Sequence, residues 1–139
     1  MQRNIIYFVF LVLLLILSAC KDKYDDCTDR DYANCNTQQP ATGRVTLEVT
    51  IDDENPVVEI HIYNGNFENN NLVFSTTVST RSFHYHLDVN NYYSATATYK
   101  KGNTTIKAID GGQMKVTSYR MCELRCYEVN GVTLDLTLK

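Results

Sequence analysis

The sequence predicts an all-β fold, an antiparallel β-sandwich of about seven or eight strands. From Gly43 onward, apolar and polar residues alternate with a period of two in a series of short runs, which is the pattern of strands that bury one face. Turn-forming segments separate the runs at a spacing of roughly 8–12 residues, which is typical of a sandwich. The composition agrees, because ten tyrosines, many Val and Thr residues and only two prolines favour strands.

The alternating runs define the expected strands in order along the chain. The first run is Val45, Leu47, Val49 and Ile51, whose side chains are expected to face the core while their polar neighbours face solvent. The later runs cover residues 58–62, 72–78, 83–89, 93–99, 106–108, 114–118 and 132–138. No segment is predicted to be helical, and no internal repeat is evident.

Polar segments between the runs are expected to be turns. They are residues 52–56, 64–65, 90–91, 100–103, 110–112 and 130–131. The Asn-Gly and Asp-Gly pairs among them are strong hairpin signals because they tolerate positive φ. If consecutive strands are antiparallel, the turns alternate between two ends. The end at which the first strand begins would hold residues 64–71, 90–91 and 110–112. The far end would hold residues 52–56, 80–82 and 100–103.

Residues 1–19 have the pattern of a secretory signal peptide. Arg3 supplies a short positive start, and the apolar run of residues 5–17 is too short to span a bilayer comfortably. The end of this run, Leu17-Ser18-Ala19-Cys20, resembles the lipobox of bacterial lipoproteins. The resemblance implies cleavage before Cys20, which then carries a thioether-linked lipid and an acylated amine. Such chains, palmitate among them, would hold the protein on a membrane.

Residues 20–42 are predicted to be a flexible tether, because they are acidic and polar and few of them could enter a core. Their start, Lys21-Asp22-Lys23-Tyr24-Asp25-Asp26, resembles the export signal of surface lipoproteins in the Bacteroides group. A plain solvated spacer is the alternative. The two resemblances together imply an outer-membrane lipoprotein of the cell envelope that is exposed at the cell surface.

The predicted sandwich covers residues 43–139. Its strand pattern, the Asn91-Tyr92-Tyr93 entry to a long strand and the closing Val-x-Leu-x-Leu-x-Leu strand resemble small immunoglobulin-like or transthyretin-like domains of cell-envelope proteins. This resemblance implies a fold and no particular function. Because the tether enters where the first strand begins, that end is expected to lie nearest the membrane.

Four cysteines remain if Cys20 is lipidated: Cys27, Cys35, Cys122 and Cys126. An even number in an exported domain predicts two disulfides, and the spacings do not match the usual zinc pattern. If residues 121–129 form a strand, Cys122 and Cys126 lie about 13 Å apart, too far for a mutual bond. Each would then bond Cys27 or Cys35 and join the tether to the sandwich. If residues 121–126 form a turn, the bonds Cys27–Cys35 and Cys122–Cys126 are the alternative.

Charge and motifs exclude two classes of function. Residues 20–139 hold 12 basic and 16 acidic side chains, a formal charge of about −4. This balance argues against a nucleic-acid partner, which needs a basic face. The chain contains no Gly-x-Ser-x-Gly, His-Glu-x-x-His or phosphate-binding glycine motif. We therefore expect no enzyme activity and no cofactor.

Two groups of residues are candidate binding sites. His61, His84 and His86 are on the polar sides of their strands and could bind zinc or copper if the strands are neighbours. Solvated histidines are the alternative. The longest loop offers Asn66, Phe67, Asn69 and Asn70 for hydrogen bonding and stacking with a sugar or a peptide. A flexible hairpin loop is the alternative.

The sequence therefore predicts a lipid-anchored cell-envelope protein. The leading hypothesis for its function is that it is a non-enzymatic binding or assembly module for a protein or glycan ligand. The second hypothesis is a metal-binding envelope protein that uses the outward-facing histidines.

Overall fold

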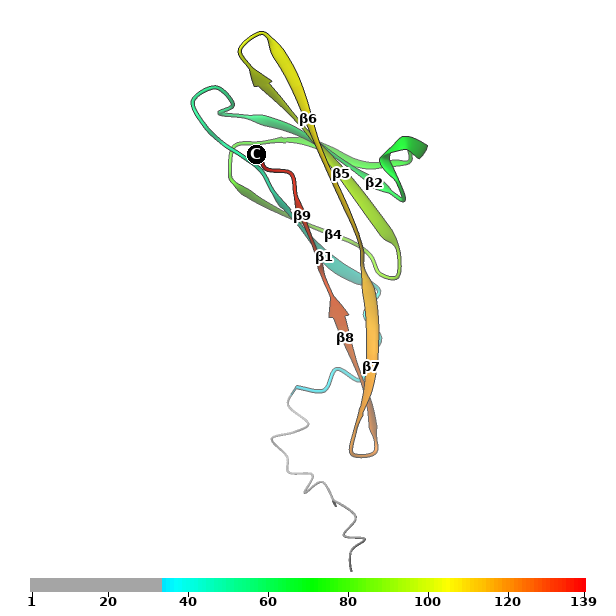
Figure 1. The fold of residues 1–139 in the computed structure, drawn as a ribbon. Coiled ribbons are helices and arrows are strands. Elements are labelled where there is room, and N and C mark those ends of the chain that lie inside the picture. The colour runs from blue at the N-terminus through cyan, green and yellow to red at the C-terminus, as the bar shows by residue number, and fades with distance from the viewer. Residues whose placement is uncertain (1–33) are drawn as a thin grey trace, which may run out of the picture. The chain divides into compact units, whose positions relative to one another are not determined.

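Figure 1 shows the fold in a computed structural model, which describes residues 34–139. This part of the chain is almost entirely β-structure, which confirms the predicted all-β class. Its strands are β1 (Thr42–Glu48), β2 (Val58–Asn64), β3 (Leu72–Val78), β4 (Ser82–Asp88), β5 (Tyr92–Lys101), β6 (Thr104–Gln113), β7 (Lys115–Met121), β8 (Leu124–Asn130) and β9 (Val132–Asp135). A short 3-10 turn, η1 (Phe67–Asn69), lies between β2 and β3. Within the described residues, no helix is long and apolar enough to cross a membrane.

The strands form two sheets and a separate hairpin. One sheet has the order β4-β1-β9, the other has the order β3-β2-β5-β6, and β7 pairs with β8. Neighbouring strands are antiparallel, except that β1 and β9 are parallel. In an immunoglobulin constant-type domain the second strand pairs with the first and the fifth. Here β2 pairs with β3 and β5, so the strand order is a different one.

The core is made by the residues that the alternation assigned to it. Its buried members include Val45, Leu47, Val58, Ile60, Ile62, Tyr93, Ala95, Ala97, Tyr99, Leu134 and Leu136. One exception is the start of β3, where the register against β2 shifts between Ile62 and Tyr63. Such a bulge changes the direction of the following side chains. Leu72, which the pattern predicts inside, is therefore 48% exposed.

Two tyrosines of β5 join the two sheets through their hydroxyl groups. The Tyr99 hydroxyl donates to the carbonyl of Leu136 over 2.6 Å and accepts from the amide of Thr50 over 3.1 Å. The Tyr93 hydroxyl donates to the carbonyl of Asp88 over 2.8 Å. Asp88 ends β4 and Leu136 directly follows β9, so β5 is held to the opposite sheet at both of its ends.

Apart from residues 110–112, the predicted distribution of turns between the two ends is confirmed. The amide of Val89 donates to the carbonyl of Ala41, which places the β4–β5 turn beside the start of β1. At the far end, the Asn55 side chain donates to the carbonyl of Lys100 over 3.0 Å and accepts from the amide of Lys100 over 2.7 Å. This pair of bonds joins the acidic turn of residues 52–56 to the β5–β6 turn.

Two of the predicted turns are wrong. Residues 110–112 lie inside β6, and residues 130–131 connect β8 to β9, which do not pair with each other. The physical reason is close packing. A Cβ at Gly131 would lie 2.8 Å from the carbonyl oxygen of Arg44, and a Cβ at Gly112 would overlap Val132. These glycines allow close approach of a neighbour and do not reverse the chain.

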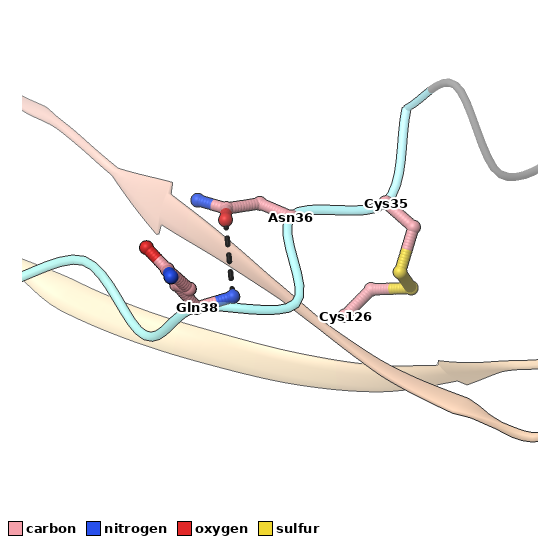
Figure 2. Close-up of a disulfide and its surroundings, with 4 residues drawn as sticks. All are labelled: Cys35, Asn36, Gln38 and Cys126. Carbon is pink, nitrogen blue, oxygen red and sulfur yellow. Dashed lines mark hydrogen bonds between the residues drawn. A yellow bond between two sulfur atoms is a disulfide. The ribbon is translucent and has the colours of Figure 1, made fainter.

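The β7–β8 hairpin extends beyond the end at which β1 begins (Figure 1). Cys126 of β8 is fully buried and forms a disulfide with Cys35, with a Cα–Cα distance of 5.0 Å (Figure 2). Beside this bond, the amide of Tyr127 donates to the carbonyl of Asn36 over 2.8 Å. Residues 34–41, which the sequence assigned to the tether, are therefore attached to the hairpin.

The Cys35–Cys126 bond confirms that a disulfide joins the N-terminal segment to the sandwich, and it excludes the local alternative. The assumption that residues 121–129 form one strand was wrong, however. Cys122 lies in the tight β7–β8 turn, with a φ of 56°, and is not in a strand with Cys126. Cys122 is itself disulfide-bonded. Cys20 and Cys27 lie outside the described residues.

Replacing Tyr99 with Phe tests the bridge between the sheets. The change leaves the partly buried amide of Thr50 and the buried carbonyl of Leu136 without the hydroxyl that pairs with them. We expect the free energy of unfolding to fall by about 1–3 kcal/mol, measured by urea denaturation. Tyr119→Phe is the matched control, because Tyr119 is 40% exposed and its substitution should change stability little.

Tyr99→Phe also tests how the free energy of unfolding depends on pH in the alkaline range. Burial raises the pKa of Tyr99 above its ordinary value of 10.0, so the folded state holds this proton more tightly than the unfolded state. The resulting stabilisation is fully present below the unfolded pKa and is lost as the pH rises through the folded pKa. Urea unfolding between about pH 8 and pH 11 should show this loss in the wild type and less of it in Tyr99→Phe. Equal pH slopes in the two proteins would contradict the assignment.

Replacing both Cys35 and Cys126 with Ala tests the covalent attachment. The bond closes a loop with a sequence separation of 91 residues. Its removal should lower the free energy of unfolding by about 2–5 kcal/mol. Asn36→Ala, a change in the same segment that removes only an exposed side-chain hydrogen bond to Gln38, is the control. A double variant as stable as this control would show that the bond does not stabilise the domain.

Candidate functional site

The outer side of the four-stranded sheet carries a cluster of aromatic and aliphatic side chains. Because Ile60, Ile62 and Tyr93 point into the core, alternation places their neighbours in sequence on the outer side. We define the aromatic face as the outward side chains His61, Tyr63, Tyr92, Thr96 and Ile109. The register puts His61, Thr96 and Ile109 in one row across β2, β5 and β6.

The ring of Tyr92 lies across Gly111 of β6. A Cβ at Gly111 would be 2.9 Å from Cζ and 3.2 Å from Cε1 of Tyr92, so the glycine makes room for the ring. Tyr92 is nevertheless 43% exposed, which leaves a large part of the ring open to solvent. The rings of His61 and Tyr63 lie with centroids 6.3 Å apart and planes 23° from parallel. The aromatic face therefore presents ring surfaces on a broad sheet.

Thr96 has an unsatisfied hydroxyl in this face. Thr96 is 1% exposed, and its Oγ1 atom has no hydrogen-bond partner in the described structure. Its cross-strand neighbours are His61 and Ile109, and Ile109 is 45% exposed. A buried polar atom without a partner is unusual and costs free energy. The register places this hydroxyl-bearing residue directly between His61 and Ile109.

Charged side chains begin one row away from the aromatic face. There Glu59 and Lys107 flank Thr98 on either side. Glu59 Oε1 lies 3.7 Å from His61 Nε2. The face itself holds no carboxylate, ammonium or guanidinium group, so a ligand that binds there meets mainly rings, an aliphatic side chain and a hydroxyl.

The predicted ligand loop lies beside this face. The amide of Gly65 donates to the carbonyl of Tyr92 over 2.7 Å, and the Ser94 hydroxyl donates to the carbonyl of Gly65 over 2.7 Å. These bonds hold the loop against the start of β5. Its candidate residues are Asn66, Asn69 and Asn70, which are exposed, and Phe67, which is half-buried. The structure thus brings the predicted loop together with the aromatic face.

Sequence analysis missed Tyr63, Tyr92 and Ile109 as site residues. Their signal was present, because each is a large apolar or aromatic residue at a solvent-facing position of an alternating strand. The number of tyrosines was attributed to strand preference alone, so those on the outer side were not distinguished from those in the core.

The three histidines do not form one site. His61 is on the outer side of the four-stranded sheet, whereas His84 and His86 are on β4 of the other sheet, where Phe83, Tyr85 and Leu87 pack toward the core. His84 Nδ1 lies 3.1 Å from the Thr46 hydroxyl, and His86 is opposite Arg44. Among residues 34–139, no group of three or more His, Cys, Asp or Glu side chains could hold a metal ion. The expected three-histidine site is therefore wrong, because the strands belong to different sheets.

The acidic turn at the far end serves the fold. Asp52 Oδ1 accepts from the Asn55 amide over 2.6 Å, and the Glu54 carboxylate accepts from the amide of Gly102. A groove of about 410 Å³ lies next to this turn, lined by Val57, Glu59, Thr98 and Lys100 among others. The carboxylates of Asp52 and Glu54 are thus engaged in holding the turn.

Comparisons of the chain with protein-family models, with curated proteins and with solved structures found no match. The evidence on function therefore comes from the residues and their geometry.

Replacing Thr96 with Val tests whether its hydroxyl is unsatisfied. Valine has a similar shape and suits a strand. Because a buried hydroxyl without a partner is removed, we expect stability to stay the same or to rise by up to about 1 kcal/mol, measured by urea denaturation. Thr98→Val, one row away on the same strand, is the control. A loss of stability in Thr96→Val would show that the hydroxyl is paired in the native state.

Proposed function

We propose that this protein is a lipid-anchored cell-envelope protein whose sandwich is a non-enzymatic binding module for a glycan or protein. The aromatic face is its binding surface, and this face is the observation on which the proposal depends. Exposed aromatic and aliphatic side chains that lie together on a surface mark interaction sites. Ring surfaces and hydroxyl groups bind and orient a ligand, which fits a module without catalytic chemistry.

The lipobox resemblance and the disulfide support the envelope location. Leu17-Ser18-Ala19-Cys20 provides the lipid anchor in this proposal, and a disulfide such as Cys35–Cys126 persists in exported proteins. The chain enters the sandwich at the start of β1, so that end would lie toward the membrane. The acidic residues after Cys20 would direct the protein to the outer surface.

Protease treatment of intact cells tests the location. The wild-type domain should be cleaved without lysis if it is exposed at the surface. Cys20→Ala should lose both lipid labelling and membrane association, because the lipidated thiol is removed. Ser18→Thr, which leaves the cysteine in place, is the control. Protection of the wild type until the outer membrane is opened would contradict surface exposure, and lipid labelling of Cys20→Ala would contradict the anchor.

A screen against glycan and peptide arrays tests the binding surface. The full-length wild-type protein should bind a ligand whose signal falls in both Tyr92→Ala and Tyr63→Ala, because these rings form the contact surface. Tyr119→Ala is the matched control, since Tyr119 is similarly exposed but belongs to the β7–β8 hairpin. Equal signals from Tyr92→Ala, Tyr63→Ala and wild type would exclude the aromatic face as the binding surface.

A further inference from the structure

Resting on the proposed function, we propose that the ligand of the aromatic face is a neutral polysaccharide. The proposal is carried by the flat Tyr92 ring, by the amide side chains of Gln113 and of the neighbouring loop, by the absence of Lys, Arg, Asp and Glu side chains from the face and by the unpaired Thr96 hydroxyl. Each of these matches one chemical property of an uncharged sugar chain.

The exposed rings match the apolar side of a sugar ring. A pyranose presents a flat array of C–H bonds, which packs on the face of an aromatic ring and removes apolar surface from water. Tyr92 lies across the backbone of Gly111 with part of its ring open. Tyr63 lies in the adjacent row of the same sheet face, so successive sugars could contact successive rings.

The amide side chains of Gln113 and of the neighbouring loop match the hydroxyl groups of a sugar. Gln113 is directly opposite Tyr92 in the register, and the exposed Asn66, Asn69 and Asn70 belong to the loop that is bonded to the start of β5. A primary amide both donates and accepts hydrogen bonds, as does a sugar hydroxyl. The loop is held in place before binding, which reduces the entropy lost on association.

The charge pattern and the backbone favour a neutral glycan over an acidic glycan or an added peptide strand. The chain has a formal net charge of −3, and the face carries no ammonium or guanidinium group to attract a uronate. An extended peptide binds by pairing with a free sheet edge. β2 and β5, which carry Tyr63, Tyr92 and Thr96, are interior strands that are paired on both sides, so at these two strands the face offers side chains and no free backbone groups.

The Thr96 hydroxyl supplies a specific polar contact. It is buried and unpaired in the described structure, and its cross-strand neighbour Ile109 is 45% exposed. A sugar hydroxyl that enters beside Ile109 would satisfy it. Binding would then be favoured by relief of an existing cost, in addition to the new contact.

Affinity electrophoresis tests this inference with the full-length protein in gels that contain glycogen, xylan, galactomannan or mixed-linkage β-glucan. Alginate and polygalacturonate are the acidic comparisons. At least one neutral polymer should retard the wild type, and the acidic polymers should not. Tyr92→Ala should lower the affinity about threefold to tenfold, whereas Tyr119→Ala should leave it unchanged. Thr96→Val should lower the affinity without lowering the urea midpoint.

Failure of all four neutral polymers to retard the wild type would overturn the inference, as would unchanged affinity of a folded Tyr92→Ala protein. Retardation by the acidic polymers alone would also overturn it. If a peptide on the array binds the wild type and is lost in Tyr92→Ala, the aromatic face stands as a binding surface and only its assignment to a glycan fails.

Discussion

The attachment of β5 to the opposite sheet is the constraint on which the rest of the domain depends. Tyr93 and Tyr99 face the core near opposite ends of this strand, and their hydroxyls donate to carbonyls of the other sheet. Between them Ala95 and Ala97 are small enough to let the sheets approach and the β2 isoleucines fill the space. These buried polar bonds are satisfied, so they fix the relative position of the sheets without leaving an unpaired group. Because Tyr92 and Thr96 are outward residues of the same strand, their positions are fixed as well.

Local sequence signals predicted the inside of the sandwich better than its connections. Period-two alternation identified the buried residues of β1, β2, β5 and β9, because burial of one face is what creates that pattern. Gly111 and Gly131 could not be interpreted in this way. A glycine that reverses the chain and a glycine that admits a neighbouring ring or carbonyl look the same in sequence, and only the packed fold distinguishes them. The prediction of a three-histidine site failed for a related reason. Alternation shows that a histidine is on the polar side of its strand, but it does not show which sheet the strand joins.

The candidate site shows the same division between local and tertiary information. The Asn-rich loop could be identified from composition, since a polar insertion between strands is a local property. Its position beside Tyr92 follows from the bonds of Gly65 to β5, which connect residues that are distant in sequence. The neutral character of the aromatic face likewise depends on register, because Glu59 and Lys107 fall together in the adjacent row. The candidate binding surface is therefore assembled by the pairing of β2, β5 and β6.

The Cys35–Cys126 bond also determines how the domain bears mechanical load. A pull on the chain ahead of Cys35 is transmitted through sulfur to β8, and β8 leads directly into β9, whose parallel pairing with β1 resists sliding along its whole length. Without the bond, the same pull would arrive at Thr42, the first residue of β1. β1 is the central strand of its sheet, whereas β9 lies at the edge. The disulfide thus moves the point at which tension enters the domain from the central strand to the hairpin that leads into the edge strand.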